Sequence, residues 1–138
     1  MGRILGVDFG IARVGLAMTD LLGITAQPMD TLNINGNIQL LVERIKELKE
    51  KSQVELVVMG YPKHMNGDVS ETAIKINEVI LKIEELGLTV VKVDERLTTV
   101  MAHKAMKEMG LKQKDKKVHA DRLAAMYILE DYLKSHNY

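Results

Sequence analysis

The fold is decided by the stretch ILGVDFG at residues 4–10. A continuous apolar run that ends at a turn signal is typical of a strand buried in a sheet. A second such run, VGLAMT at residues 14–19, follows after a connection of only a few residues. Because parallel strands need a crossover of about a dozen residues, the two runs predict an antiparallel hairpin. Asp8 then lies near the end of the first strand, at the core of the domain.

A carboxylate on a buried strand is costly unless it is paired, hydrogen-bonded or bound to a metal. Two further acids have comparable settings. Glu95 follows the β-branched run at 88–93, and ligands of open α/β sheets bind at the carboxyl ends of strands. Asp121 falls in the first turns of a predicted closing helix. Each acid also has an ordinary explanation: backbone N–H groups for Asp8, a pair with Arg96 for Glu95, and the helix dipole for Asp121. The three together favour a common site.

Composition predicts one domain that spans residues 1–138, with ordinary hydrophobic (46%) and charged (28%) fractions. The chain has no cysteine, which excludes disulfides and thiolate metal sites. We find neither a signal peptide nor an apolar run of about 18 residues. We therefore expect a cytoplasmic protein without a membrane partner.

The charge is uneven, although the formal net charge is zero. A zero net charge argues against indiscriminate coating of DNA. A lysine-rich segment nevertheless precedes Asp121; it carries Lys104, Lys107, Lys112, Lys114, Lys116 and Lys117 against Glu108 and Asp115. Such runs usually form a solvated face. Here the run also predicts a surface that attracts phosphate beside the acids.

The remaining pattern predicts the order of the elements. An extended stretch at 24–32 completes a three-strand meander, and Pro28 marks it as an edge strand. The apolar spacing after this stretch predicts alternating helices and strands: a helix at 38–48, a strand at 54–59, a helix at 68–86 and a strand at 88–93. A helix at 98–109, a basic loop and a final helix to 134 complete the chain. This is an α/β fold: a mixed five-stranded sheet, antiparallel in the meander and parallel after it, with helices on both faces. Asp8 is expected on a central strand and Glu95 on its neighbour. The order resembles the ribonuclease H-like fold.

Four motifs carry a closer resemblance: ILGVDFGIARVGLAMTD at 4–20, GYPKHMNG at 60–67, VDERLTT at 93–99 and DRLAAMYILEDYL at 121–133. They resemble the bacterial pre-16S rRNA nuclease family, also called YqgF-type Holliday junction resolvases. The resemblance implies that Asp8, Glu95 and Asp121 are the catalytic acids and bind a divalent metal. It also implies a bacterial cytoplasmic enzyme that processes the 5′ end of 16S rRNA.

Hydrolysis of a phosphodiester needs an activated water and a stabilised leaving oxygen. Two Mg²⁺ or Mn²⁺ ions roughly 3.5–4 Å apart supply both and prefer hard oxygen ligands. We expect Asp8 to bridge the ions, and Glu95 and Asp121 to complete one shell each. Candidate nucleic-acid contacts are Arg13, Lys63, Arg96, Lys112, Lys114, Lys116 and Lys117. For Arg13 an ion pair that orients the acids is an equal alternative, and for Arg96 a structural pair with Glu95 is favoured.

Other functions stay open at this point. The substrate is pre-16S rRNA or branched DNA, and cutting a junction generally needs a symmetric dimer, so the protein is a monomer or a homodimer. A noncatalytic RNA-binding domain would explain the lysines and leave Asp8 unexplained. An actin-like ATPase fragment would explain the Asp-Phe-Gly hairpin, but such proteins close two domains around the nucleotide. Asp20 ends the second strand about 20 Å from Asp8, so we expect a turn residue there.

Overall fold

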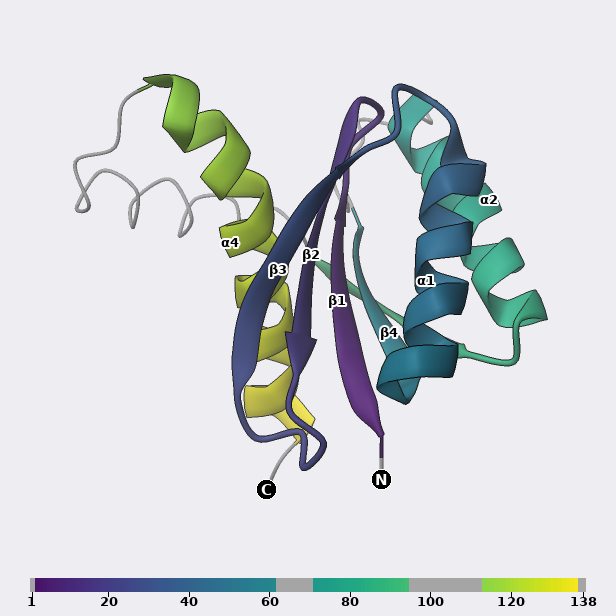
Figure 1. The fold of residues 1–138 in the computed structure, drawn as a ribbon, viewed down its shortest axis with the longest axis vertical. Coiled ribbons are helices and arrows are strands. Elements are labelled where there is room, and N and C mark those ends of the chain that lie inside the picture. Colours follow the sequence, from purple (N-terminus) through teal and green to yellow (C-terminus); the bar gives the residue numbers. More distant parts are fainter. Residues whose placement is uncertain (1, 62–70, 95–112, 137–138) are drawn as a thin grey trace.

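The protein is described by a computed structural model that covers residues 2–61, 71–94 and 113–136 (Figure 1). The elements are, in order, β1 (Arg3–Phe9), β2 (Arg13–Thr19), β3 (Ala26–Asn33), α1 (Ile38–Ser52), β4 (Val54–Tyr61), α2 (Glu71–Glu85), β5 (Thr89–Asp94) and α4 (Gln113–His136). Within these ranges no helix is both long enough and apolar enough to cross a membrane.

The five strands form one sheet in the order β3-β2-β1-β4-β5. The β3, β2 and β1 strands are antiparallel neighbours, and β1, β4 and β5 are parallel. Helices α1 and α2 cover one face, and α4 lies on the other (Figure 1). The predicted mixed sheet, with its meander and with helices on both faces, is therefore confirmed. The strand that contains Pro28 is an edge strand, as expected.

The core has two parts, one on each face of the sheet. The larger part lies between the sheet and the α1/α2 layer, and it includes Leu5, Val7 and Phe9 of β1. The smaller part joins the sheet to α4 through Ala17, Val58, Ala125, Ile128 and Leu129. Since odd positions of β1 face the α1/α2 layer, the even positions, including Asp8, belong to the α4 face.

Helix α4 packs unusually close to β1 because one strand position has no side chain. A Cβ atom added to Gly6 would lie 2.6 Å from Cγ of Leu129 and 2.8 Å from the carbonyl oxygen of Ala125. The backbone oxygen cannot give way, so glycine is required there. This contact fixes the height of α4 against the strand that carries Asp8.

The β1–β2 hairpin is also closed tightly. Asp8 lies opposite Gly15, and Phe9 opposite Val14. A Cβ atom at Gly10 would lie 2.5 Å from the carbonyl oxygen of Arg13. The short connection therefore depends on glycine two residues after Asp8, where the backbone of Arg13 leaves no space for a side chain.

Two predictions about the elements were wrong. Glu95 was expected on a strand next to that of Asp8, but β4 separates β1 from β5, which is the other edge strand. The places on either side of β1 are occupied by β2 and β4, so β5 pairs with the far side of β4. The final helix also begins earlier than expected, at Gln113. Lys114, Lys116 and Lys117 therefore lie in α4 and not in a loop, and residue 121 lies two turns inside the helix. The predicted helix at 98–109 and the start of the helix at 68 fall outside the described residues.

Candidate active site

The candidate site lies where the carboxyl ends of β1, β4 and β5 meet at one edge of the sheet. Asp8 is half-buried there, and its Oδ1 atom is buried. It belongs to the face that α4 covers, because Gly6, two residues earlier on the strand, touches α4. The β1 strand is the middle strand of the sheet, held on both sides by ladders of hydrogen bonds. Asp8 thus belongs to a strand whose backbone is paired on both sides.

Residue 121 lies in α4 on the helical stripe that faces β1. Residues 121, 125 and 129 are spaced four apart, so they share one side of the helix, and Ala125 and Leu129 are the residues that meet Gly6. Helix α4 and β1 run in opposite directions (Figure 1). Asp8 is about 7 Å beyond Gly6 along the strand, and residue 121 is about 6 Å beyond Ala125 along the helix. The fold therefore brings positions 8 and 121 to the same height.

Glu95 is outside the described residues, as are Lys63, Arg96 and Lys112. The chain enters residue 95 from Asp94, the last residue of β5, which pairs with Tyr61. Val93, two residues before Glu95, packs in the part of the core formed with α4. Among the described residues no three His, Cys, Asp or Glu form a metal-binding group.

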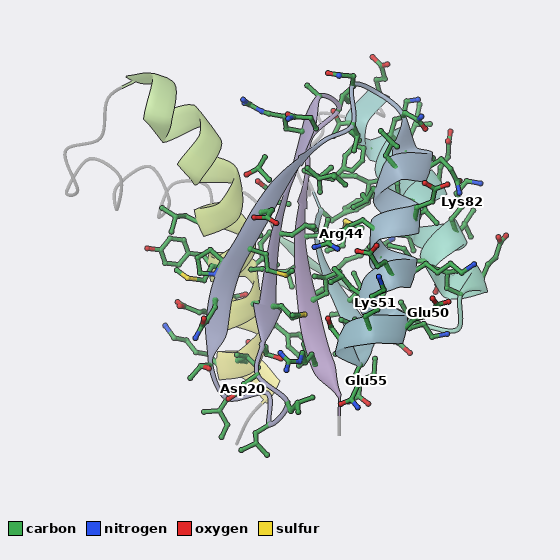
Figure 2. The ribbon with its side chains drawn as sticks, viewed as in Figure 1. Asp20, Arg44, Glu50, Lys51, Glu55 and Lys82 are labelled. Atoms are coloured by element: carbon green, nitrogen blue, oxygen red, sulfur yellow. The ribbon has the colours of Figure 1, made fainter. Side chains whose placement is uncertain are left out.

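The described basic candidates are found at the same end of the molecule. Arg13 is half-buried at the start of β2; it is two residues from Gly15, so it shares the α4 face with Asp8. Lys114, Lys116 and Lys117 are in the first turns of α4, at the end where β1 terminates (Figure 1). The opposite layer, in contrast, carries mixed charge. Arg44 pairs with Glu47, and Lys51 lies 3.9 Å from the same carboxyl group, on helix α1 (Figure 2).

Comparison with known proteins identifies the family. Residues 2–135 match the RuvX family, described as Holliday junction resolvase. The chain belongs to this family. It is 42% identical over 135 residues to a protein of Acetivibrio thermocellus, covering 96% of each chain, and 43% identical over 136 residues to one of Lactococcus lactis subsp. lactis strain IL1403, covering 97% of this chain and 95% of that one. Both relatives carry the name "Putative pre-16S rRNA nuclease". The family expected from the four motifs is confirmed.

The fold of this RuvX-family chain is that of RuvC. The structure of T. thermophilus RuvC in complex with a Holliday junction substrate superposes with a TM-score of 0.60. The match covers 98% of this chain and 96% of the other at 18% sequence identity. A second RuvC structure from Thermus thermophilus gives 0.57. The ribonuclease H-like fold is therefore confirmed.

A polar cluster that the motifs did not reveal lies at the end of β4. The Lys92 ammonium lies 4.6 Å from the centre of the Tyr61 ring, and Nδ2 of Asn77 donates a hydrogen bond of 3.2 Å to the Tyr61 hydroxyl. Tyr61 packs on the α1/α2 side of the sheet, away from Asp8. It is the residue from which the chain enters the segment 62–70. The cluster joins residues of β4, β5 and α2, which only the fold brings together.

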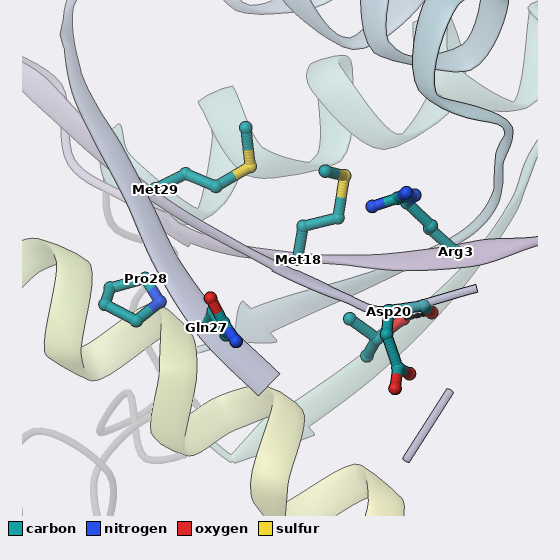
Figure 3. A pocket seen from close by; sticks show the side chains of 7 residues that line it. Arg3, Met18, Asp20, Gln27, Pro28 and Met29 are labelled. Carbon is teal, nitrogen blue, oxygen red and sulfur yellow. Dashed lines mark hydrogen bonds between the residues drawn. The ribbon is translucent and has the colours of Figure 1, made fainter. Parts of the chain in front are cut away.

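A cavity beside β2 and β3 lies at the end of the sheet opposite to Asp8. It has a volume of about 240 Å³ and is lined by Arg3, Met18, Thr19, Asp20, Gln27, Pro28 and Met29 (Figure 3). The Nε atom of Arg3 is buried and has no hydrogen-bond partner among the described residues. Asp20 forms the rim as a turn residue, since its Oδ1 accepts a hydrogen bond of 2.8 Å from the backbone N–H of Ile24. The expectation that Asp20 belongs to a turn is confirmed.

The pH dependence of Asp20 gives a first prediction. The hydrogen bond from Ile24 N–H lowers the pKa of this carboxyl below its ordinary value of 3.8. A lowered pKa means that the carboxylate stabilises the turn above pH 3.8 and that this contribution is lost as pH falls through the lowered value. We expect wild type to have a higher melting temperature than Asp20→Asn at neutral pH. The difference between the two melting temperatures should disappear in acid. A difference in melting temperature that does not change with pH would show that the Asp20 carboxylate charge does not stabilise the turn.

Proposed function

We propose that the protein is a metal-dependent nuclease that hydrolyses phosphodiester bonds, with the 5′ end of precursor 16S rRNA as its substrate. The observation that carries the proposal is the placement of Asp8 and residue 121 at one height on the α4 face. The names of the full-length relatives support the same activity. Such a substrate would place the protein in the bacterial cytoplasm.

The residues present suit a hard divalent cation. Asp8 supplies carboxylate oxygens from a rigid strand, one of them buried, and Glu95 and Asp121 would add oxygens from the end of β5 and from α4. Oxygen-only ligand sets are those that Mg²⁺ and Mn²⁺ prefer. These three acids would hold the ions, two in number. When bound, such ions lower the pKa of a water molecule and stabilise the charge on the leaving oxygen.

The remaining chemistry belongs to the chain itself. The strand ladders on either side of β1 keep Asp8 from moving as charge develops, so little reorganisation is needed during the reaction. The close contact of α4 with Gly6 sets the height of residue 121 against Asp8. Arg13 lies on the same face, where its guanidinium can bind and orient a phosphate of the substrate.

A cleavage assay tests the proposal directly. We expect the purified protein with Mg²⁺ to cut RNA fragments that span the precursor 5′ boundary, with less activity on four-way DNA junctions. The second candidate, a resolvase of branched DNA, is favoured by the description of the family and by the RuvC fold. Preferential cutting of junctions by a homodimer would establish that function instead. Absence of cleavage on both substrates would refute a nuclease.

The lysines provide a second prediction. A lysine is a flexible point charge that binds phosphate without reading the bases. Replacement of Lys112, Lys114, Lys116 and Lys117 by glutamine should weaken RNA binding similarly for different sequences. The slope of log affinity against log salt should fall by about 0.7 for each phosphate of a single strand that the variant no longer neutralises. Cleavage at saturating substrate should persist, because the acids remain. An unchanged slope would show that these lysines face solvent and do not contact the phosphates.

A further inference from the structure

The pairing of β2 with β3 places two polar residues in line with Asp8. Asp8 on β1 lies opposite Gly15 on β2, and Gly15 lies opposite Thr31 on β3. Arg13, two residues before Gly15 on β2, lies opposite Asn33 on β3, nearer the end where β1 terminates. Residues directly opposite one another share a face of the sheet. Thr31, Arg13 and Asn33 therefore share the α4 face with Asp8; we name these three residues the hairpin strip.

The strip leads from the candidate site to the edge of the sheet. Neighbouring strands are about 4.8 Å apart, so Thr31 lies about 10 Å from Asp8, and Asn33 lies about 12 Å away. Gly15, between Asp8 and Thr31, carries no side chain to interrupt the row. Thr31 and Arg13 are half-buried, and Asn33 is exposed. Because β3 is an edge strand, a bound polymer can continue past it.

The backbone under the strip is held firmly in place. The carbonyl oxygen of Ala12 accepts hydrogen bonds of 3.0 Å from the N–H groups of both Ile34 and Asn35, and that of Ile11 accepts one of 2.7 Å from Gly36. These bonds join the β1–β2 connection to the segment that follows β3. The strip thus has a fixed register against Asp8, as a contact surface for a substrate requires.

The side chains of the strip suit a nucleic-acid backbone. Hydroxyl, amide and guanidinium groups all donate hydrogen bonds to phosphate oxygens. None of the three is acidic, whereas the neighbouring Asp8 is. We propose that Thr31 and Asn33, with Arg13, bind the phosphates on one side of the scissile bond and guide that strand over the edge at β3. This inference deepens the proposed nuclease function and rests on it.

Binding of a fluorescently labelled single-stranded RNA tests the strip without requiring cleavage. We expect Asn33→Asp to raise Kd roughly tenfold in low salt, because a like charge then faces a phosphate. Thr31→Val should raise it roughly threefold by removing one donor. The matched control is Gln27→Glu, which adds the same charge to the same strand. Gln27 lies opposite Met18, on the other face, about 20 Å from Asn33 toward the start of β3.

The position of the contact can be mapped on the RNA. Methylphosphonate groups, which remove one phosphate charge, are placed singly on either side of the cleavage position. On one side only, the modification should weaken binding to wild type and strengthen binding to Asn33→Asp, because removing the phosphate charge also removes its repulsion by the new carboxylate. The proposal would be overturned if Asn33→Asp and Gln27→Glu weakened RNA binding equally. It would also be overturned if methylphosphonates on both sides of the cleavage position changed RNA binding equally.

These outcomes separate the two proposals. Cleavage by wild type together with identical behaviour of Asn33→Asp and Gln27→Glu overturns the strip and leaves the nuclease function standing. Selective loss of binding in Asn33→Asp without cleavage by wild type supports the strip and refutes the nuclease. If wild type binds neither RNA nor a four-way junction, both proposals fail.

Discussion

Asp8→Asn is expected to lower the cleavage rate at saturating substrate by roughly a thousandfold, while the protein without metal keeps its stability or gains slightly. The rate should fall because the proposed metal site would lose the charged ligand that the middle strand of the sheet provides. A loss of about 4 kcal/mol of transition-state stabilisation corresponds to that factor. Stability should not fall, because the change removes one negative charge from the acids that we propose to form the site.

The controls distinguish catalysis from folding. Asp20→Asn makes the same chemical change at an acid of the β2–β3 turn, and it should cleave like wild type. Melting of Asp8→Asn without metal should occur at or slightly above the wild-type temperature. A large fall in melting temperature would show that Asp8 serves mainly to complete backbone hydrogen bonds in the core.

The hairpin was predictable because its determinants are local. A buried run, a short connection and a second buried run leave an antiparallel pair as the only solution. Asp8 could therefore be placed near the end of β1 from the sequence alone. The edge position of β3 followed for a similar reason, since Pro28 lacks the N–H group that an inner strand needs.

The place of β5 was not predictable from such local features. The pattern at 88–93 shows a buried strand, but not which strand lies beside it; β4 occupies the position next to β1. The start of α4 was missed for a different reason. Lys114, Lys116 and Lys117 indicated a solvated loop, yet lysine, glutamine and alanine favour helix, and the segment 113–120 contains neither glycine nor proline.

The hairpin strip could not be predicted from the sequence, because it depends on how the strands pair. Thr31 and Asn33 belong to a stretch without a distinctive motif, and their relation to Asp8 depends on register across two strand pairs. The register of β2 with β3 also shifts between Gly15 and Ala17. A shift of one residue would send both side chains to the other face. Only the pairing itself shows which residues align with the acid.

Metal removal is the second change with a large expected effect. Excess chelator should abolish cleavage, and Mg²⁺ or Mn²⁺ should restore it, because the proposed ligands are all carboxylates. Calcium should bind but support little turnover, since the ion is larger and its coordination is looser.

Metal binding can also be measured apart from activity: Mg²⁺ at about 100 times its Kd should stabilise wild type by about 2.7 kcal/mol. The same addition should stabilise Asp8→Asn much less, whereas Asp20→Asn should respond like wild type. Full cleavage in excess chelator would refute a metal-dependent mechanism. Equal stabilisation of Asp8→Asn and wild type would place the ions away from Asp8, so that the half-buried carboxylate on β1 would need another role.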